Sequence, residues 1–294
     1  RPQGIDGKTV TIDNARLAIT PGERSTESKL QLNFRTSRGI DHTVTLPEGA
    51  ELTSVILNGT TQPIKQTGST VILPLTPGNQ LAELTWRESQ GISTHYQTAA
   101  FQLGSDSVNN HIVVELPRNR WTLFTRGPVL GPAVLFWGVL IVIAIVAIAL
   151  SRYGQTPLGI TSWFLLGIGR SQTHVLAALP VILWLLLLGQ RKALGEKLLD
   201  SRWRFNLLQL LIAGLSLFAL ATMIGAIEQG LLGHPEMQIA GNSSSAYQLK
   251  WYQDRSAEWF PQAQIISVPL LAYRILMLAW ALWLAFALLK CCLL

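Results

Sequence analysis

Cysteine is almost absent from this 294-residue chain: its two cysteines, Cys291 and Cys292, are adjacent near the C-terminal end. This excludes a disulfide framework across the rest of the chain. The five histidines are scattered without a ligand spacing such as HxxxH, and no nucleotide-binding or catalytic fingerprint occurs. We therefore expect no metal, no cofactor and no catalytic residues, and we interpret the chain as non-enzymatic.

Charge is scarce as well. Only 14% of the residues are charged and 49% are hydrophobic, a balance unusual for a soluble domain. Of the net charge of +6, residues 130–294 carry +5, in basic residues that flank hydrophobic runs. No basic stripe with aromatic platforms is visible. We therefore expect a lipid bilayer as a partner and no nucleic acid.

Residues 1–120 contain short alternating runs separated by turn residues, and no helical period. Asn58-Gly59 between two such runs is a two-residue hairpin signal. Eight or nine strands at this spacing predict an all-β antiparallel sandwich, with a barrel as the alternative. The predicted strands include "TVTIDNARLAI", "KLQLNF", "HTVTL", "TSVIL", "STVILPL", "LAELTW" and "HIVVEL".

Residues 121–294 predict an α-helical transmembrane bundle with an external loop at 231–264. The runs 132–150, 206–230 and 265–289 are each near the roughly 20 residues that a span needs. The stretch 159–189 is either a hairpin that dips in and returns, or an interfacial helix followed by one crossing. In the connector before the bundle, Trp121 and Phe124 are expected at the level of the lipid headgroups.

The choice between these two interpretations of residues 159–189 determines on which side of the membrane the sandwich lies. The basic loop 190–204 is expected in the cytoplasm and the loop 231–264 outside. A hairpin at 159–189 then makes the sandwich periplasmic, whereas one crossing makes it cytosolic. We favour a multi-pass protein of the bacterial inner membrane with a periplasmic sandwich, because the sandwich is rich in Ser, Thr, Asn and Gln.

Arg274 interrupts the last apolar run, about nine residues from its start, and exposing a guanidinium to lipid is costly. Glu228 lies near the outer end of the preceding span. We predict that the two pair across helix faces rich in small residues, which allow close approach. The alternatives are that both side chains reach headgroups separately, or that they belong to an ion pathway. The predicted packing residues are Gly214, Ala221 and Gly225 on one helix and Ala281 and Ala285 on the other.

The external loop is rich in aromatic residues. Tyr247, Trp251, Tyr252 and Trp259 are candidates for contact with a sugar or with another protein. The alternative is an ordered loop that packs on the sandwich.

Four stretches carry a family resemblance: "RGPVLGPAVLFWG", "RFNLLQLL", "MQIAGNSSSAYQLKWYQDRS" and "LAYRILMLAWALWLA". Through them, residues 117–290 resemble the C-terminal region of large uncharacterised proteobacterial inner-membrane proteins. The resemblance implies a periplasmic β-rich region before the bundle, and no catalytic residues. Because the chain begins at Arg1, we expect a processed product or the C-terminal part of a longer protein.

From these observations we expect a scaffold, assembly or accessory subunit of a larger membrane complex, in contact with other membrane protein subunits. A carbohydrate- or envelope-polymer-binding protein is the first alternative, and a membrane transport component is the second.

Overall fold

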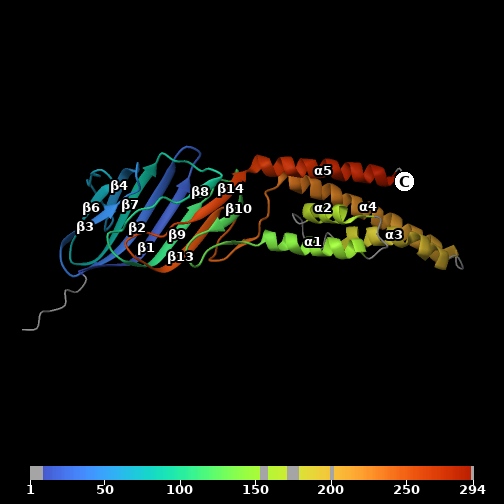
Figure 1. The fold of residues 1–294 in the computed structure, drawn as a ribbon, viewed down its shortest axis with the longest axis horizontal. Coiled ribbons are helices and arrows are strands. Elements are labelled where there is room, and N and C mark those ends of the chain that lie inside the picture. The colour runs from blue at the N-terminus through green and yellow to red at the C-terminus, as the bar shows by residue number, and fades with distance from the viewer. Residues whose placement is uncertain (1–8, 153–157, 171–178, 199–201, 293–294) are drawn as a thin grey trace, which may run out of the picture. The chain divides into compact units, whose positions relative to one another are not determined.

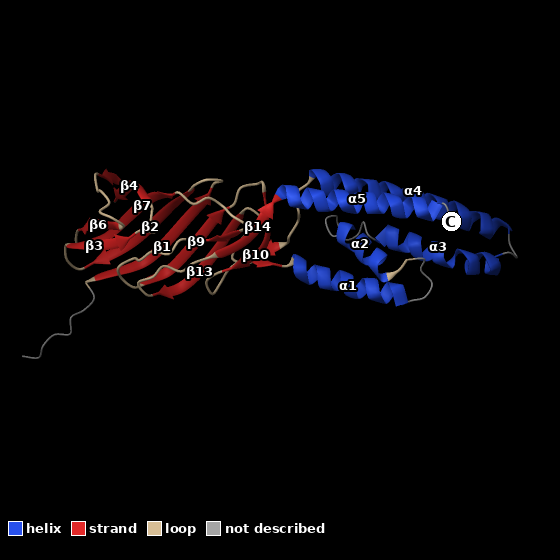
Figure 2. Ribbon diagram, turned by 45° about the horizontal axis from the view of Figure 1, so that its top comes forward, coloured by secondary structure: helices blue, strands red, loops and turns tan. Residues whose placement is uncertain are grey.

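Two compact units make up the chain. The computed structural model describes residues 9–152, 158–170, 179–198 and 202–292. The β unit comprises residues 1–134 and 237–269, and the helical unit comprises 135–236 and 270–294. Figure 2 colours the strands of the first unit red and the helices of the second blue. The β unit is therefore assembled from two segments that lie far apart in the sequence.

A seven-stranded sheet forms one layer of the β unit (Figure 1). All neighbours are antiparallel except β1 and β9, which run parallel. The prediction of a purely antiparallel fold is therefore wrong, and the sheet is mixed. A parallel pair needs a long connection, which the chain between β1 and β9 supplies. In sheet order the strands are β13 (Gln248–Ser256), β9 (Ser107–Glu115), β1 (Val10–Pro21), β2 (Thr26–Thr36), β7 (Gly78–Glu88), β4 (Glu51–Leu57) and β5 (Thr60–Gln62).

Smaller sheets form the remainder of the β unit. β3 (Ile40–Thr45) pairs with β6 (Thr70–Leu75), and β14 (Gln264–Pro269) lies between β10 (Arg120–Arg126) and β8 (His95–Gln97). Isolated bridges link Thr45 to Gln102 and Gln102 to Trp259. A last pair consists of β11 (Ala133–Val134) and β12 (Ile239–Ala240).

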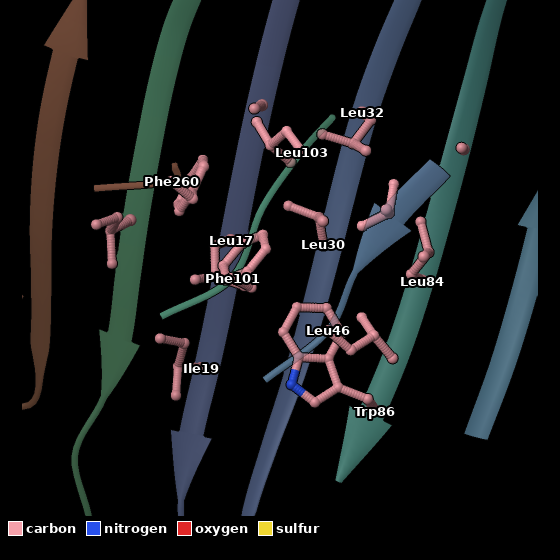
Figure 3. Packing of buried hydrophobic residues seen from close by; sticks show 14 of the residues in the cluster. Leu17, Ile19, Leu30, Leu32, Leu46, Leu84, Trp86, Phe101, Leu103 and Phe260 are labelled. Atoms are coloured by element: carbon pink, nitrogen blue, oxygen red, sulfur yellow. The ribbon is translucent and has the colours of Figure 1, made fainter. Parts of the chain in front are cut away.

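The core of the β unit lies between the large sheet and these smaller sheets. On β2, alternate residues are buried, as the period of two in a strand requires. Leu30, Leu32 and Trp86 project from the sheet toward Leu46 and Phe101 of the opposing segments (Figure 3). Full burial of each leucine contributes about 1.5–3 kcal/mol relative to an exposed side chain. The packed β layers are thus consistent with the predicted sandwich.

The predicted hairpin at Asn58-Gly59 is confirmed. Both residues have positive φ, 50° and 81°, and Leu57 pairs with Thr60 across the turn. Positive φ at two successive central residues is the geometry that Asn-Gly favours in a two-residue loop.

The described residues of the helical unit form five helices: α1 (Phe136–Arg152), α2 (Ile160–Arg170), α3 (Leu179–Leu198), α4 (Arg202–Leu232) and α5 (Leu270–Cys292). Two of them contain stretches long and apolar enough to cross a membrane, Asn206–Leu232 and Leu270–Leu288. The described part of α1 is a shorter apolar helix, so two of the three expected long spans meet this criterion. Residues 265–269 of the third expected span belong instead to β14.

The unit boundaries differ from the prediction. Residues 121–134 belong to the β unit, and the expected loop 231–264 contains strands β12 and β13 and the first residue of β14. These strands pair with β11, β9 and β10, more than a hundred residues earlier in the chain. Such long-range pairing leaves little local periodicity from which it could be predicted.

Candidate functional site

The structure does not bring Glu228 and Arg274 together. Both residues are exposed, and among the residues that the structure describes no ion pair joins them. Because α5 begins at Leu270, Arg274 lies about 6 Å along the helix rather than the depth expected for a span beginning at 265. Glu228 likewise lies one turn before the end of α4. Separate contact with headgroups, the alternative considered above, agrees better with these positions.

A different face of each long helix packs inside the helical unit. On α4 and α5 the buried residues recur at intervals of three and four, with one interval of seven on α4, as expected for one helical face. The predicted packing residues Gly214, Ala221 and Ala285 are exposed, and Gly225 and Ala281 are half-buried. The buried residues are Ile212, Ala219, Met223, Ala226 and Gly230 on α4, and Leu270, Tyr273, Met277, Trp280 and Leu284 on α5.

Other glycines mark the close approaches between helices. A Cβ added at Gly230 would lie 2.1 Å from Cε of Met277, and one at Gly169 would lie 2.0 Å from the indole of Trp280. Around Gly214 and Gly225 nothing lies within 4 Å of such a Cβ. The principle that small residues mark helix contacts therefore holds, but it applies to positions that the sequence analysis did not select.

Indole groups add polar contacts between helices. Nε1 of Trp280 on α5 donates to the carbonyl oxygen of Leu165 on α2 at 2.7 Å. Nε1 of Trp184 on α3 donates to Oγ of Ser216 on α4 at 2.7 Å. In a nonpolar environment such bonds specify which faces meet, because an unpaired N–H is costly there.

Trp251, a predicted contact residue, is a core residue with 1% of its surface exposed. It lies on β13, and its indole supports the loop between β10 and β11. A Cβ at Gly127 would lie 2.5 Å from its Nε1, and a Cβ at Gly131 would lie 2.2 Å from its Cδ1. The indole therefore fits only against glycine at both positions.

The two tyrosines of the predicted cluster lie on or beside the same strand. The hydroxyl of Tyr252 donates to Oδ1 of Asn109 at 3.0 Å, and its ring centroid lies 5.0 Å from that of His111. Burial, together with nearby Arg16, lowers the pKa of His111. Tyr247 is half-buried, and its carbonyl accepts the Leu116 N–H. The interpretation of this segment as packed on the sandwich is therefore the one that agrees with the structure.

Trp259 remains as an exposed aromatic residue, with 55% of its surface accessible. It lines a groove of about 760 Å³ together with residues 45–48, 69, 88–90 and 99–102. Oε1 of Glu88, in this lining, accepts bonds from Nε1 of Trp86 at 2.9 Å and Oγ of Ser28 at 3.2 Å. Burial raises the pKa of nearby Tyr96 to about 12, with Glu88 adding to the shift. The groove thus combines an indole face with acidic and amide side chains.

His42 on β3 was not singled out from the sequence. Only 7% of its surface is exposed, its Nε2 lies 2.6 Å from the Leu103 carbonyl oxygen, and its ring contacts Phe34 edge-on. Burial lowers the pKa of His42, although the bond to Leu103 opposes this. Its place in an alternating strand is the only signal that could have indicated burial. Within the described ranges no group of three His, Cys, Asp or Glu side chains is placed to hold a metal ion.

Comparison with known proteins gives little. No protein-family model matches the sequence, and no curated protein is significantly similar to it. Among solved structures, an M1 zinc metallopeptidase from Deinococcus radiodurans has 12% identity and a TM-score of 0.33, over 42% of this chain and 36% of that one. A mutant of that enzyme bound to a Tyr-Ser-Ala substrate gives the same values. The match spans about a third of the peptidase chains, and a TM-score this low supports no inference about this chain.

Proposed function

We propose that this chain is a membrane-anchored, non-enzymatic subunit whose β unit lies on the periplasmic side of a bacterial inner membrane. Support for a membrane comes from the outward faces of the helices. Leu217 on α4 and Phe286 on α5 expose more than two thirds of their surfaces, and Ile275 and Leu282 more than half. A helix that is apolar on all sides is suited to lipid or to a protein interior.

One observation carries the membrane topology of the proposal. β11 pairs with β12, so that Val134, just before the helices α1–α4, lies opposite Ile239, just after them. Both ends of this helical segment therefore lie on the same side of any membrane, and α1–α4 must cross it an even number of times. If α1 and α4 each cross once, then α2 and α3 together return to the side from which they started. This favours the hairpin interpretation of residues 159–189.

Charge supports the orientation. The α3–α4 junction lies on the side opposite the β unit in this topology, and five basic residues surround it: Arg191, Lys192, Lys197, Arg202 and Arg204. Such clusters are typical of cytoplasmic loops, which makes the β unit periplasmic. The resemblance of residues 117–290 to proteobacterial inner-membrane proteins agrees with this orientation.

Cysteine labelling tests the topology. Thr60→Cys and Leu198→Cys are made separately in a chain in which Cys291 and Cys292 are replaced by serine. In intact spheroplasts a membrane-impermeant maleimide is expected to label position 60, and position 198 only after permeabilisation. Labelling of both positions in intact spheroplasts would contradict the proposed topology.

For the role itself we propose a scaffold, assembly or accessory component that binds other membrane subunits. The apolar outward faces of α4 and α5 and the polar outer face of the large sheet are surfaces suited to such contacts. Purification in a gentle detergent is expected to recover stoichiometric companions. Recovery of the chain alone at several detergent concentrations would count against this role.

The Trp259 groove favours a second candidate, binding of a carbohydrate or envelope polymer. An exposed indole beside carboxylate and amide groups is suited to stacking on a sugar and to hydrogen bonds with its hydroxyls. Glycan-array binding that Trp259→Ala abolishes and Ile72→Ala preserves would support it. Trp251 is unsuitable for this test, because its truncation would disturb the core.

A further inference from the structure

An exposed apolar loop precedes the helical segment. We propose that this loop, residues 126–132 (the interfacial loop), inserts its tip into the headgroup layer of the bilayer. The proposal rests on the membrane anchoring proposed above and adds a second, independent contact with lipid.

Exposure identifies the tip. Among residues 9–134 and 237–269 of the β unit, six large hydrophobic residues are exposed, and three of them, Phe124, Val129 and Leu130, lie within seven consecutive residues. Val129 exposes 84% of its surface and Leu130 exposes 55%. The other three, Ile72, Leu81 and Trp259, are scattered along the chain. A concentration of this kind on an otherwise polar domain marks an interaction site.

The loop is held in one conformation although its tip is exposed. The Thr125 hydroxyl donates to the Pro132 carbonyl oxygen at 2.8 Å, which closes the base of the loop. Leu130 and Tyr252 exchange two backbone hydrogen bonds, of 3.1 and 2.7 Å. The Trp251 indole lies against Gly127 and Gly131. Because these contacts order the loop before it binds anything, insertion costs little conformational entropy.

Two observations identify the occupant as the bilayer. α1 begins at Phe136, six residues after Leu130, so the tip lies within about 20 Å of chain from an apolar helix. Arg126 is exposed at the start of the loop, where its guanidinium can bind a lipid phosphate while the aliphatic side chains enter the acyl boundary. Basic and aliphatic residues on one surface are typical of interfacial membrane contact.

The test places an environment-sensitive NBD fluorophore on single cysteines in the full chain. The background carries Cys291→Ser and Cys292→Ser, and the protein is reconstituted into vesicles of phosphatidylcholine and phosphatidylglycerol. The three positions are Val129→Cys at the tip, Ile72→Cys as an exposed aliphatic control in the β unit, and Leu217→Cys on α4. Lipids carrying a nitroxide near the headgroup serve as shallow quenchers, and lipids carrying it in mid-chain serve as deep quenchers.

We expect the shallow quencher to remove about half of the emission at position 129, as for a side chain inserted at the headgroup boundary, and to leave position 72 unchanged. The emission of the fluorophore at position 217 should be reduced by the deep quencher. Quenching at 217 without quenching at 129 would overturn the interfacial loop alone. A blue-shifted but unquenched fluorophore at 129 would indicate a protein neighbour and would also overturn it. Absence of quenching at 217 would instead overturn the membrane anchoring.

Discussion

At the scale of single residues, the aromatic residues of the β unit act mainly as internal supports. Trp251 is buried and determines where glycine is required, whereas Trp259, eight residues later, is exposed in a groove. Composition predicts neither outcome, because both tryptophans lie in the same polar, aromatic-rich segment. The difference follows from pairing with β9, which turns the Trp251 side chain into the core.

The contact between Trp251 and Gly131 gives the first prediction. Gly131→Ala introduces a Cβ 2.2 Å from Cδ1 of the buried indole, so the loop or the strand must move. We expect a loss of about 1–3 kcal/mol in the free energy of unfolding, as for other overpacked sites. Chemical denaturation followed by tryptophan fluorescence measures it. Gly39→Ala is the control, because its Cβ makes only an ordinary 3.6 Å contact; equal losses in both variants would contradict the role of Trp251.

His42 gives a prediction about pH. Its pKa is lowered below the ordinary 6.5 by burial, so the folded chain binds this proton less readily than the unfolded chain. Stability is therefore lost as pH falls below about 6.5, with a slope of at most about 1.4 kcal/mol per pH unit for one proton. The test measures the free energy of unfolding of the wild type and of His42→Gln at pH values from 7.5 to 5, a range of about two and a half units.

The variant is expected to lose less stability over this range, even if it is less stable at pH 7.5. The lowered pKa of His111 affects both proteins and cancels in the difference. Parallel pH profiles for wild type and variant would show that His42 does not carry this dependence.

At the scale of elements, alternation was a sufficient guide for the first half of the chain. Every strand predicted from residues 9–116 is present, and in β2 and β7 buried residues alternate with more exposed ones as the sequence pattern predicts. The short strand β8 was missed, since three residues are too few to define a period, whereas β5, equally short, was indicated by the Asn58-Gly59 turn that precedes it. The existence of the long helices was predictable, but their packing faces were not, because α4 and α5 are apolar on every side.

The packing face of α4 gives the third prediction. Gly230→Leu places a side chain where Met277 now lies, whereas Gly214→Leu places one in open space. We expect Gly230→Leu to destabilise the full chain in mild detergent by about 1–3 kcal/mol, and Gly214→Leu to leave it unchanged or slightly more stable. Thermal unfolding of the two variants, which exchange the same residue types in the same helix, measures the difference. A larger loss of stability in Gly214→Leu than in Gly230→Leu would instead favour the packing face predicted from the sequence.

At the scale of the whole molecule, strands that pair in one sheet lie far apart in the sequence, so the order of the elements does not indicate which of them pair. An abrupt change of composition near residue 130 marks the start of helices α1–α4, but strands β12, β13 and β14 follow these helices, precede α5, and pair with β11, β9 and β10. A boundary drawn from local composition therefore assigned residues 237–269 to the wrong unit. These residues belong to the β unit because their strands pair with strands more than a hundred residues earlier in the chain.

The pairing of β11 with β12 makes the helices α1–α4 an insertion in the turn of a β-hairpin, and this gives the last prediction. Val134 and Ile239 are directly opposite each other on antiparallel strands, so a two-residue turn can join them. A chain in which Asn-Gly replaces residues 135–238 and which ends at Pro269 is expected to fold as the β unit without detergent. Residues 9–134 alone, which lack β13 and β14, leave the β9 edge and the site of Trp251 uncovered and should aggregate. Gel filtration and cooperative thermal unfolding distinguish the two, and a joined chain that is as insoluble as residues 9–134 would show that the β unit depends on the helices for its stability.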